Sequence, residues 1–220
     1  MKLSKYIDHT LLKPQATNAD LEKLCKEAIE NEFAAVCVNP CNVVYCAGLL
    51  AGTKVKLASV VGFPLGASIP SIKSAETLMA VEDGANEIDM VINIGALKNG
   101  NKVLVEADIK AVVSSAEGNT VKVIIETCLL KDEEKVIACE LSKSAGAHFV
   151  KTSTGFSSGG ATVDDVKLMK TAVGDALEVK ASGGVRSYED AMAMIEAGAT
   201  RIGTSSGIAI LQGKKAENDY

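Results

Sequence analysis

The sequence predicts an α/β protein with the closed (β/α)8 barrel, or TIM barrel, fold, and two observations support this. Short apolar runs alternate eight times with segments in which apolar residues recur at helical spacing. A glycine-alanine step closes three of the helical segments, at residues 82–85, 144–147 and 196–199, shortly before the next apolar run. Eight such units in 220 residues favour one barrel domain, residues 1–220. The alternative, a doubly wound sheet, requires a glycine-rich turn after the first strand, which this sequence lacks.

The eight expected strands are apolar runs with the length of a buried strand, bounded by turn-forming residues. They span residues 6–9, 34–38, 56–61, 87–92, 121–126, 148–151, 177–181 and 200–203. The segments between them place apolar residues at intervals of three and four, as in a helix that covers one side of a sheet. This pattern is clear at residues 21–29, 72–79, 136–145 and 163–173.

Residues suited to helix ends stand at the edges of the helical segments. Polar side chains that precede acidic residues indicate helix starts at Thr17 or Asn18, Thr162 and Ser187. Glycines, which accept a left-handed backbone, indicate helix ends at Gly84, Gly146, Gly174 and Gly198. The boundaries therefore agree with the strand-helix alternation.

The composition argues against nucleic-acid and membrane partners. The net charge is −5, the isoelectric point is near 5.2, and arginine occurs only at Arg186 and Arg201, so no basic patch is expected. No stretch approaches the roughly 18 apolar residues of a membrane span. The start of the chain lacks the apolar run of a signal peptide. We therefore expect a cytoplasmic protein.

Cysteine and histidine usage argues against a metal site. The six cysteines form no CxxC pair, and a cytosolic setting disfavours disulfides. The two histidines, His9 and His148, lie far apart in the sequence and fit no zinc-ligand pattern. We therefore expect chemistry without a metal.

The ends of the expected strands hold the candidate site residues, because the active site of a (β/α)8 barrel lies where its strands end. The residues at these ends are Asp8, Cys37, Gly62, Asp89, Glu126, Lys151, Lys180 and Ser205. Carboxylates and two lysines would then share one small, partly dry barrel mouth.

Lys151 is the strongest candidate nucleophile. It ends an apolar run, and lysine is seldom buried without a function because its charged form is costly to desolvate. Lys180 ends the neighbouring expected strand, so desolvation and like charge both favour the neutral amine. A neutral amine attacks carbonyls and forms Schiff bases. The alternative is that both lysines extend to solvent.

Four further residues have weaker or different claims. Asp89 lies among apolar residues and needs a partner, so it is either a proton-transfer group or half of a structural salt bridge. Asp8 and Glu126 are interpreted as orienting groups or as plain polar packing. Cys37 is interpreted as a small buried hydrophobe rather than a reactive thiol.

Two glycine- and serine-rich loops indicate a phosphate site. They follow the seventh and eighth expected strands, which is the usual phosphate site of this fold, and Gly155, after the sixth expected strand, is expected to help line the same pocket. Small residues let backbone N–H groups converge on an anion. The candidate phosphate-binding residues are Gly155, Gly183, Gly184, Gly203, Ser205 and Ser206.

Six motifs spread over nearly the whole chain resemble one known family. They read DHTLLK (8–13), VCVNP (36–40), GFPLG (62–66), EIDMV (87–91), FVKTSTGF (149–156) and VKASGGVR (179–186). Together they resemble the deoxyribose-phosphate aldolases, and the motifs around the two lysines are the most specific.

The resemblance implies a class I aldolase that uses no metal or other cofactor. Its reaction would be the reversible cleavage of 2-deoxy-D-ribose 5-phosphate to D-glyceraldehyde 3-phosphate and acetaldehyde, in deoxynucleoside breakdown. It implies Lys151 as the Schiff-base lysine, Lys180 as its perturbing neighbour and Asp89 as a proton relay. Some members end in a tyrosine that enters the site, so Tyr220 is a candidate proton donor.

Two other functions stay open on the residues alone. One is an isomerase-type phosphosugar enzyme with a carboxylate base and no Schiff base, although the paired lysines argue against it. The other is a non-catalytic barrel that binds a phosphometabolite. In each case we expect a small phosphosugar ligand, and a homo-oligomer, either a dimer or a tetramer.

Overall fold

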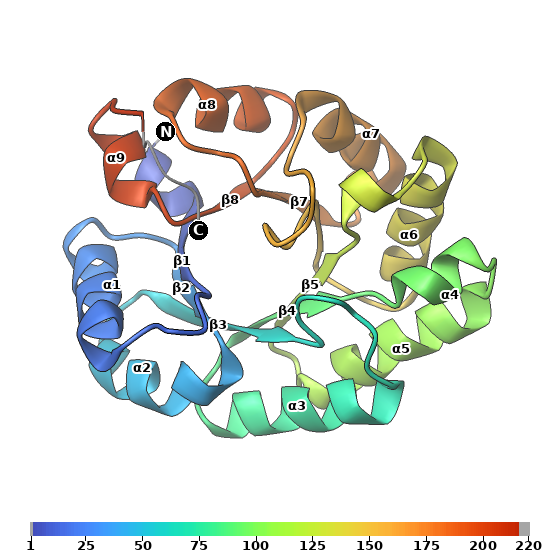
Figure 1. Ribbon diagram of the computed structural model, residues 1–220, viewed down its shortest axis with the longest axis horizontal. Helices are drawn as coiled ribbons and strands as arrows, with labels where there is room; N and C mark the ends of the chain where they lie inside the picture. Colours follow the sequence, from blue (N-terminus) through green and yellow to red (C-terminus); the bar gives the residue numbers. More distant parts are fainter. Residues whose placement is uncertain (1, 216–220) are drawn as a thin grey trace.

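The computed structural model, which describes residues 2–215, contains a closed barrel of eight parallel strands within that range (Figure 1). The strands are β1 Ile7–Leu11, β2 Ala35–Val38, β3 Lys56–Val61, β4 Glu87–Val91, β5 Thr120–Ile124, β6 Phe149–Lys151, β7 Glu178–Ser182 and β8 Arg201–Thr204. Each strand pairs with the next, and β8 pairs with β1 through Ile7 and Ile202, which closes the barrel. The predicted fold class is confirmed, and the predicted strand ends lie within two residues of the observed ones.

The helices form an outer ring around the strands (Figure 1). They are α1 Asn18–Glu30, α2 Val43–Leu50, α3 Pro70–Glu82, α4 Ile94–Lys98, α5 Lys102–Ser115, α6 Asp132–Ser144, α7 Val163–Val173, α8 Tyr188–Glu196 and α9 Gly207–Leu211. Short 3-10 turns are η1 Leu3–Tyr6, η2 Pro40–Asn42 and η3 Thr127–Leu129. Within residues 2–215, no helix combines the length and the apolar character that a bilayer crossing requires.

The predicted helix caps are present. Thr17, rather than Asn18, caps α1, because its hydroxyl accepts a hydrogen bond from the Asp20 N–H. Thr162 and Ser187 cap α7 and α8 in the same way. The glycines predicted at helix ends all have positive φ angles. Local sequence therefore determines where the helices begin and end.

Apolar residues occupy two separate regions. The larger core lies between the strands and the helices. The smaller one consists of Leu12, Cys37, Ala58 and Val60, with Phe63 packed against it, and comes from β1 to β3 and the residues beside them. Because strand side chains alternate between the two faces of a sheet, Ala58 and Val60 share one face of β3. On β4 to β8 and on β1, the corresponding positions carry charged side chains.

Candidate active site

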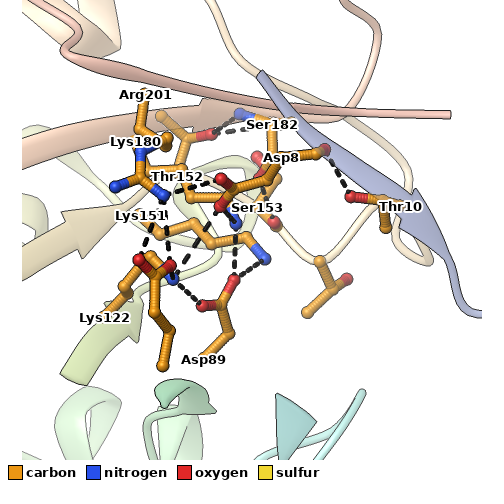
Figure 2. A network of polar contacts seen from close by, with 12 residues as sticks. Asp8, Thr10, Asp89, Lys122, Lys151, Thr152, Ser153, Lys180, Ser182 and Arg201 are labelled. Carbon is orange, nitrogen blue, oxygen red and sulfur yellow. Dashed lines mark hydrogen bonds and ion pairs between the residues drawn. The ribbon is translucent and has the colours of Figure 1, made fainter. Parts of the chain in front are cut away.

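Within residues 2–215, seven charged side chains form one connected network inside the barrel (Figure 2). They are Asp8 from β1, Glu87 and Asp89 from β4, Lys122 from β5, Lys151 from β6, Lys180 from β7 and Arg201 from β8. Arg201 has 16% of its side chain exposed, and the other six have 5% or less. Charges this deeply buried are stable only when they are paired.

Asp89 lies at the centre of the network. Its Oδ2 accepts hydrogen bonds from Lys151 Nζ at 2.8 Å and from Lys180 Nζ at 2.7 Å. Its Oδ1 accepts one from Lys122 Nζ at 2.7 Å. Figure 2 shows the three lysine side chains converging on this carboxylate from three consecutive strands. The carboxylate can therefore exchange protons with any of the three amines.

Asp8 holds the other side of Lys180. Its Oδ2 accepts from Lys180 Nζ at 2.5 Å, and its Oδ1 accepts from Arg201 Nη1 at 2.7 Å. Lys180 is thus placed between two carboxylates, those of Asp8 and Asp89. Asp8 joins the first and last strands of the barrel to the central carboxylate.

The expectation that these residues stand at strand ends is corrected for three of them. Asp8, Asp89 and Lys180 lie inside β1, β4 and β7, whereas Lys151 is the last residue of β6. Barrel strands are tilted and staggered, so positions that are level across the barrel are not equally far along their strands. Lys151 nevertheless pairs in register with Lys180, which brings the two amines to the same carboxylate oxygen.

Sequence reasoning missed Lys122, Glu87 and Arg201. Lys122 lies inside an apolar run, away from the strand ends at which a barrel site is expected. The alternation of side chains along a strand could have identified the charged residues that point into the barrel. Glu87 is two residues from Asp89, so both point to the same face of β4.

The comparisons with known proteins decide the family. The family model for the DeoC/LacD family aldolases matches residues 2–213. The chain belongs to this aldolase family. It is 62% identical over 220 residues to the deoxyribose-phosphate aldolases of Streptococcus gordonii and Macrococcus caseolyticus, with all of each chain covered. The resemblance noted in the sequence is confirmed.

Solved structures of aldolases agree with this assignment. The DeoC/LacD family chain has a TM-score of 0.92 and 43% identity to the aldolase QR15, over 96% of this chain and 94% of that one. It has a TM-score of 0.90 and 37% identity to the tetrameric deoxyribose phosphate aldolase of Aeropyrum pernix, over 96% and 89% of the two chains. The barrel of this chain therefore has the same fold as these solved aldolase structures.

The three lysines of this DeoC/LacD aldolase are not equivalent. Burial lowers the pKa of Lys151; Asp89 raises it in part, and the Lys180 ammonium lowers it again, so the pKa stays below its ordinary value. Burial also acts to lower the pKa of Lys180, but Asp8 and Asp89 outweigh burial and raise it. The pKa of Lys122 is raised too, because Asp89 and Glu87 outweigh burial. The expectation that both strand-end lysines are driven towards neutrality therefore holds for Lys151 and is wrong for Lys180.

Cys37 and Glu126 lie beside the network of this aldolase rather than in it. Cys37 belongs to the small inner apolar cluster, and burial raises the pKa of its thiol to about 11. Glu126 follows β5 with a left-handed backbone, φ 56°. Its carboxylate accepts hydrogen bonds from the Thr154 hydroxyl at 2.5 Å and from the Thr154 N–H at 3.3 Å. It therefore holds the loop that follows Lys151. Tyr220 lies outside the described residues.

The predicted phosphate residues of this aldolase lie in three places. Gly155, Gly183 and Gly184 line a cavity of about 210 Å³ between the loops after β6 and β7. Ser205 and Ser206 line a separate cavity of about 290 Å³ that His9 and Lys13 also line. Gly203 lines neither of these cavities. It lies inside β8, where a Cβ atom would stand 2.9 Å from Lys180 Cε, so its role is to leave room for that side chain.

Proposed function

We propose that this chain cleaves 2-deoxy-D-ribose 5-phosphate reversibly to D-glyceraldehyde 3-phosphate and acetaldehyde, through a Schiff base on Lys151. The observation that carries the proposal is the Lys151 amine, buried, lowered in pKa and hydrogen-bonded to Asp89 at 2.8 Å. An amine close to neutrality attacks an aldehyde, and the neighbouring carboxylate moves the protons. The curated relatives named deoxyribose-phosphate aldolase support this substrate.

In the cleavage direction, the neutral Lys151 amine attacks C1 of the open-chain sugar phosphate and forms a carbinolamine. Loss of water gives the protonated Schiff base, which withdraws electrons from the bond between C2 and C3. Loss of the C3 hydroxyl proton breaks that bond, releases D-glyceraldehyde 3-phosphate and leaves an enamine. Protonation of the enamine at C2 and hydrolysis then release acetaldehyde and the free amine. Asp89 and Lys180 are the groups proposed to carry these protons.

The phosphate of the substrate is proposed to bind at the loops after β6, β7 and β8. Small residues there leave backbone N–H groups accessible to an anion, and α8 begins close by at Tyr188. Gly155, Gly183 and Gly184 line one of the two cavities at these loops, and Ser205 and Ser206 line the other. Gly203 is not part of this proposed phosphate site, because it lies inside β8 and lines neither cavity.

Borohydride trapping tests the proposed function. The protein is incubated with acetaldehyde or 2-deoxy-D-ribose 5-phosphate and sodium borohydride, digested with trypsin and mapped by mass spectrometry. We expect a reduced adduct on Lys151, and Lys151→Arg is expected to remove both the adduct and the activity. Lys26→Arg is the matched control, because the Lys26 side chain is 75% exposed on α1 and lines neither proposed phosphate cavity. An unmodified Lys151 under turnover would contradict the proposal.

The same experiment separates the alternatives. An isomerase with a carboxylate base would remain active as Lys151→Arg. A non-catalytic barrel would bind a phosphosugar tightly in calorimetry without turnover. Asp89 is paired with three lysines, which makes it a poor carboxylate base and disfavours the isomerase.

We also propose a single-domain, cytoplasmic homo-oligomer, either a dimer or a tetramer. The six cysteines are free thiols, as in a reducing compartment. Exposed apolar side chains cluster on α2, α3 and the loop before α3, which suits a contact between copies. They are Val44, Leu65, Ile69, Ile72 and Met79. Light scattering of the purified protein measures the oligomeric state, and a monomer would contradict this part of the proposal.

A further inference from the structure

Two charged residues of the network, Glu87 and Arg201, lie away from the reacting amine. They are the first residues of β4 and β8, so they stand towards the amino-terminal end of the barrel, opposite the end where the substrate enters. Hydrogen bonds join each of them to the network, and among those of residues 2–215 none joins either one to Lys151. The steps of the proposed reaction assign no proton transfer or substrate contact to either residue.

Their contacts lead to Asp89 by two routes. Arg201 Nη1 donates to Asp8 Oδ1 at 2.7 Å, and Asp8 binds Lys180, which binds Asp89. Glu87 Oε2 lies 2.6 Å from Lys122 Nζ, and Lys122 donates to the other oxygen of Asp89. Arg201 Nη1 also lies 3.1 Å from Glu87 Oε2, which joins the two routes at their base. Figure 2 shows Arg201, Asp8, Lys180 and Lys122 in this arrangement.

The charges of the network do not balance when every group is ionised. Among the described residues, it contains four basic groups, Lys122, Lys151, Lys180 and Arg201, and three carboxylates, Asp8, Glu87 and Asp89. A net charge in a dry interior is costly, so the network is stable when one basic group is neutral. Arginine does not lose its proton in proteins, which leaves the three lysines.

The number of carboxylate partners determines which lysine is neutral. Lys180 binds Asp8 at 2.5 Å and Asp89 at 2.7 Å. Lys122 binds Glu87 at 2.6 Å and Asp89 at 2.7 Å, and its Nζ lies 3.8 Å from Asp8 Oδ2. Within the described structure Lys151 binds one carboxylate, Asp89, and therefore loses its proton at the lowest cost. Glu87 supplies the shortest carboxylate contact of Lys122, and Arg201 keeps Asp8 and Glu87 in place.

We propose that Glu87 and Arg201 are positioning residues of the aldol reaction, which fix the charges of Asp8 and Lys122 from the closed end of the barrel and so leave Lys151 as the neutral amine. This inference rests on the proposed Schiff-base function. The titratable groups that face Lys151 from the surrounding elements are Cys37 from β2, Asp89 from β4, Lys122 from β5, Glu126 after β5 and Lys180 from β7. The substitutions below leave all of these in place.

The test is the pH dependence of kcat/KM in three variants. Arg201→Met removes a positive charge, so Lys151 keeps its proton more readily and the acid limb of the profile moves to higher pH. Glu87→Gln removes a negative charge and moves the same limb to lower pH. Each shift is expected to be about one pH unit, the effect of one charge several ångströms away in a protein interior. The double variant E87Q/R201M restores the balance, so its limb returns close to the wild-type position.

A second readout does not depend on turnover. The rate at which acetaldehyde and cyanoborohydride modify Lys151 is measured across the same pH range by peptide mapping. It is expected to shift in the same directions, because only the neutral amine reacts. Arg201→Lys is the matched control that keeps the charge, and its profile is expected to stay in place.

Residues with a merely structural role would lower activity in both single variants without moving the limb in opposite directions, and that result would overturn the proposal. If Arg201→Met does not fold, Glu87→Gln and Arg201→Lys decide the matter, since a shift in the first without one in the second is required. Modification of a lysine other than Lys151 would instead contradict the proposed function, so the two failures are distinguishable.

Discussion

Asp89 is the residue on which most of the chemistry depends. One carboxylate accepts hydrogen bonds from Lys122, Lys151 and Lys180, and burial would raise its pKa if these lysines did not hold the pKa well below its ordinary value. It therefore stays ionised beside an amine whose pKa is lowered by burial. An ionised carboxylate within hydrogen-bond distance can accept the proton that the Lys151 nitrogen gives up after it attacks an aldehyde.

Asp89→Asn is expected to separate the attack of Lys151 from the later steps. The amide cannot take up a proton, so kcat for cleavage is expected to fall by about 10²–10⁴. Lys151 and Lys180 remain, and Lys180 can still carry protons during Schiff-base formation, so the borohydride adduct is expected to form, but more slowly. Steady-state kinetics and adduct mapping measure the two effects, with Asp175→Asn, at an exposed carboxylate, as the control. A kcat within a few-fold of wild type would contradict the role of Asp89 in proton transfer.

At this scale the sequence identified the residues nearest the chemistry but not those that support them. Lys151 and Lys180 stand out in the sequence because each lies at or next to the end of an apolar run, and Asp89 stands out because it is a carboxylate among apolar residues. Lys122 was missed because an apolar run was treated as a uniform strand, whereas every second residue of β5 faces the interior. The pairing of Arg201 with Asp8 joins residues 193 positions apart, and no local pattern predicts such a contact.

At the scale of elements, the loops after β6 and β7 are held against each other. Ala161 N–H donates to the carbonyl oxygens of Ser182 at 3.1 Å and Gly183 at 2.9 Å. A Cβ atom on Gly160 would lie 2.3 Å from the Gly183 oxygen, so only glycine permits this approach. The cavity lined by Gly155, Gly183 and Gly184 depends on that contact.

Gly160→Ala is therefore expected to weaken phosphate binding. The methyl group forces the two loops apart, and a displacement of this kind reduces binding about 10- to 100-fold. We expect KM for 2-deoxy-D-ribose 5-phosphate to rise by that factor, with little change in kcat/KM for unphosphorylated 2-deoxyribose. Gly48→Ala is the control, because a Cβ there meets nothing within 4 Å. Equal losses on both substrates would indicate damage to the lysine network instead.

Helix capping gives a second prediction at this scale. Ser187 Oγ accepts from Asp190 N–H at 3.1 Å, and Asp190 Oδ2 accepts from the Ser187 N–H at 3.0 Å. Ser187→Ala is expected to lower the free energy of unfolding by about 1 kcal/mol. Urea denaturation measures this, with Ser114→Ala, on the exposed face of α5, as the control. No loss of stability would show that α8 is fixed by its packing alone.

Such caps could be predicted because they are local, involving residues three apart in the sequence. The division of the candidate phosphate residues between two cavities could not, because it depends on how separate loops fold over the barrel. Gly203 was assigned to a loop for the same reason. Its observed position, against Lys180 inside the barrel, follows from the strand register.

At the scale of the whole molecule, the barrel interior is divided between an apolar side, formed by β2 and β3, and a charged side that runs from β4 through β8 to β1. A buried charge network contributes less stability than apolar packing of the same volume, even when its members are paired. The charged side therefore reflects the reaction more than the fold. Of the three lysines in the network, Lys151 is the one whose pKa is lowered, so its charge contributes unfavourably to the free energy of folding.

Lys151→Met is accordingly expected to stabilise the protein. The folded pKa of Lys151 lies below its unfolded value of about 10.4, so the unfolded chain binds the proton more tightly and Lys151 destabilises the fold at neutral pH. We expect Lys151→Met to raise the free energy of unfolding at pH 7 by about 1 kcal/mol. The gain should shrink as the pH rises through the unfolded pKa of about 10.4, above which the lysine is neutral in both states.

Lys180→Met is the matched comparison for this prediction. The folded pKa of Lys180 is raised, so its charge stabilises the fold at every pH below its unfolded value, and its removal leaves Asp8 and Asp89 short of a partner. A loss of about 3 kcal/mol or more is expected at pH 7. Urea denaturation at pH 7 and near pH 10 measures both variants. A loss of similar size in both would mean that Lys151 is an ordinary charged ion-pair partner.

The contacts of Asp8 with Lys180 and Arg201 also affect how the protein is made. A chain emerging from the ribosome presents Asp8 long before the two cations that pair with it have been synthesised. Until β8 has left the exit tunnel, the carboxylates and lysines of the earlier strands have to remain hydrated, which keeps the unfinished interior open to water. Aldolase activity is thus available only to a molecule whose last strand has joined its first, and measuring that activity during translation would time the closure of the barrel.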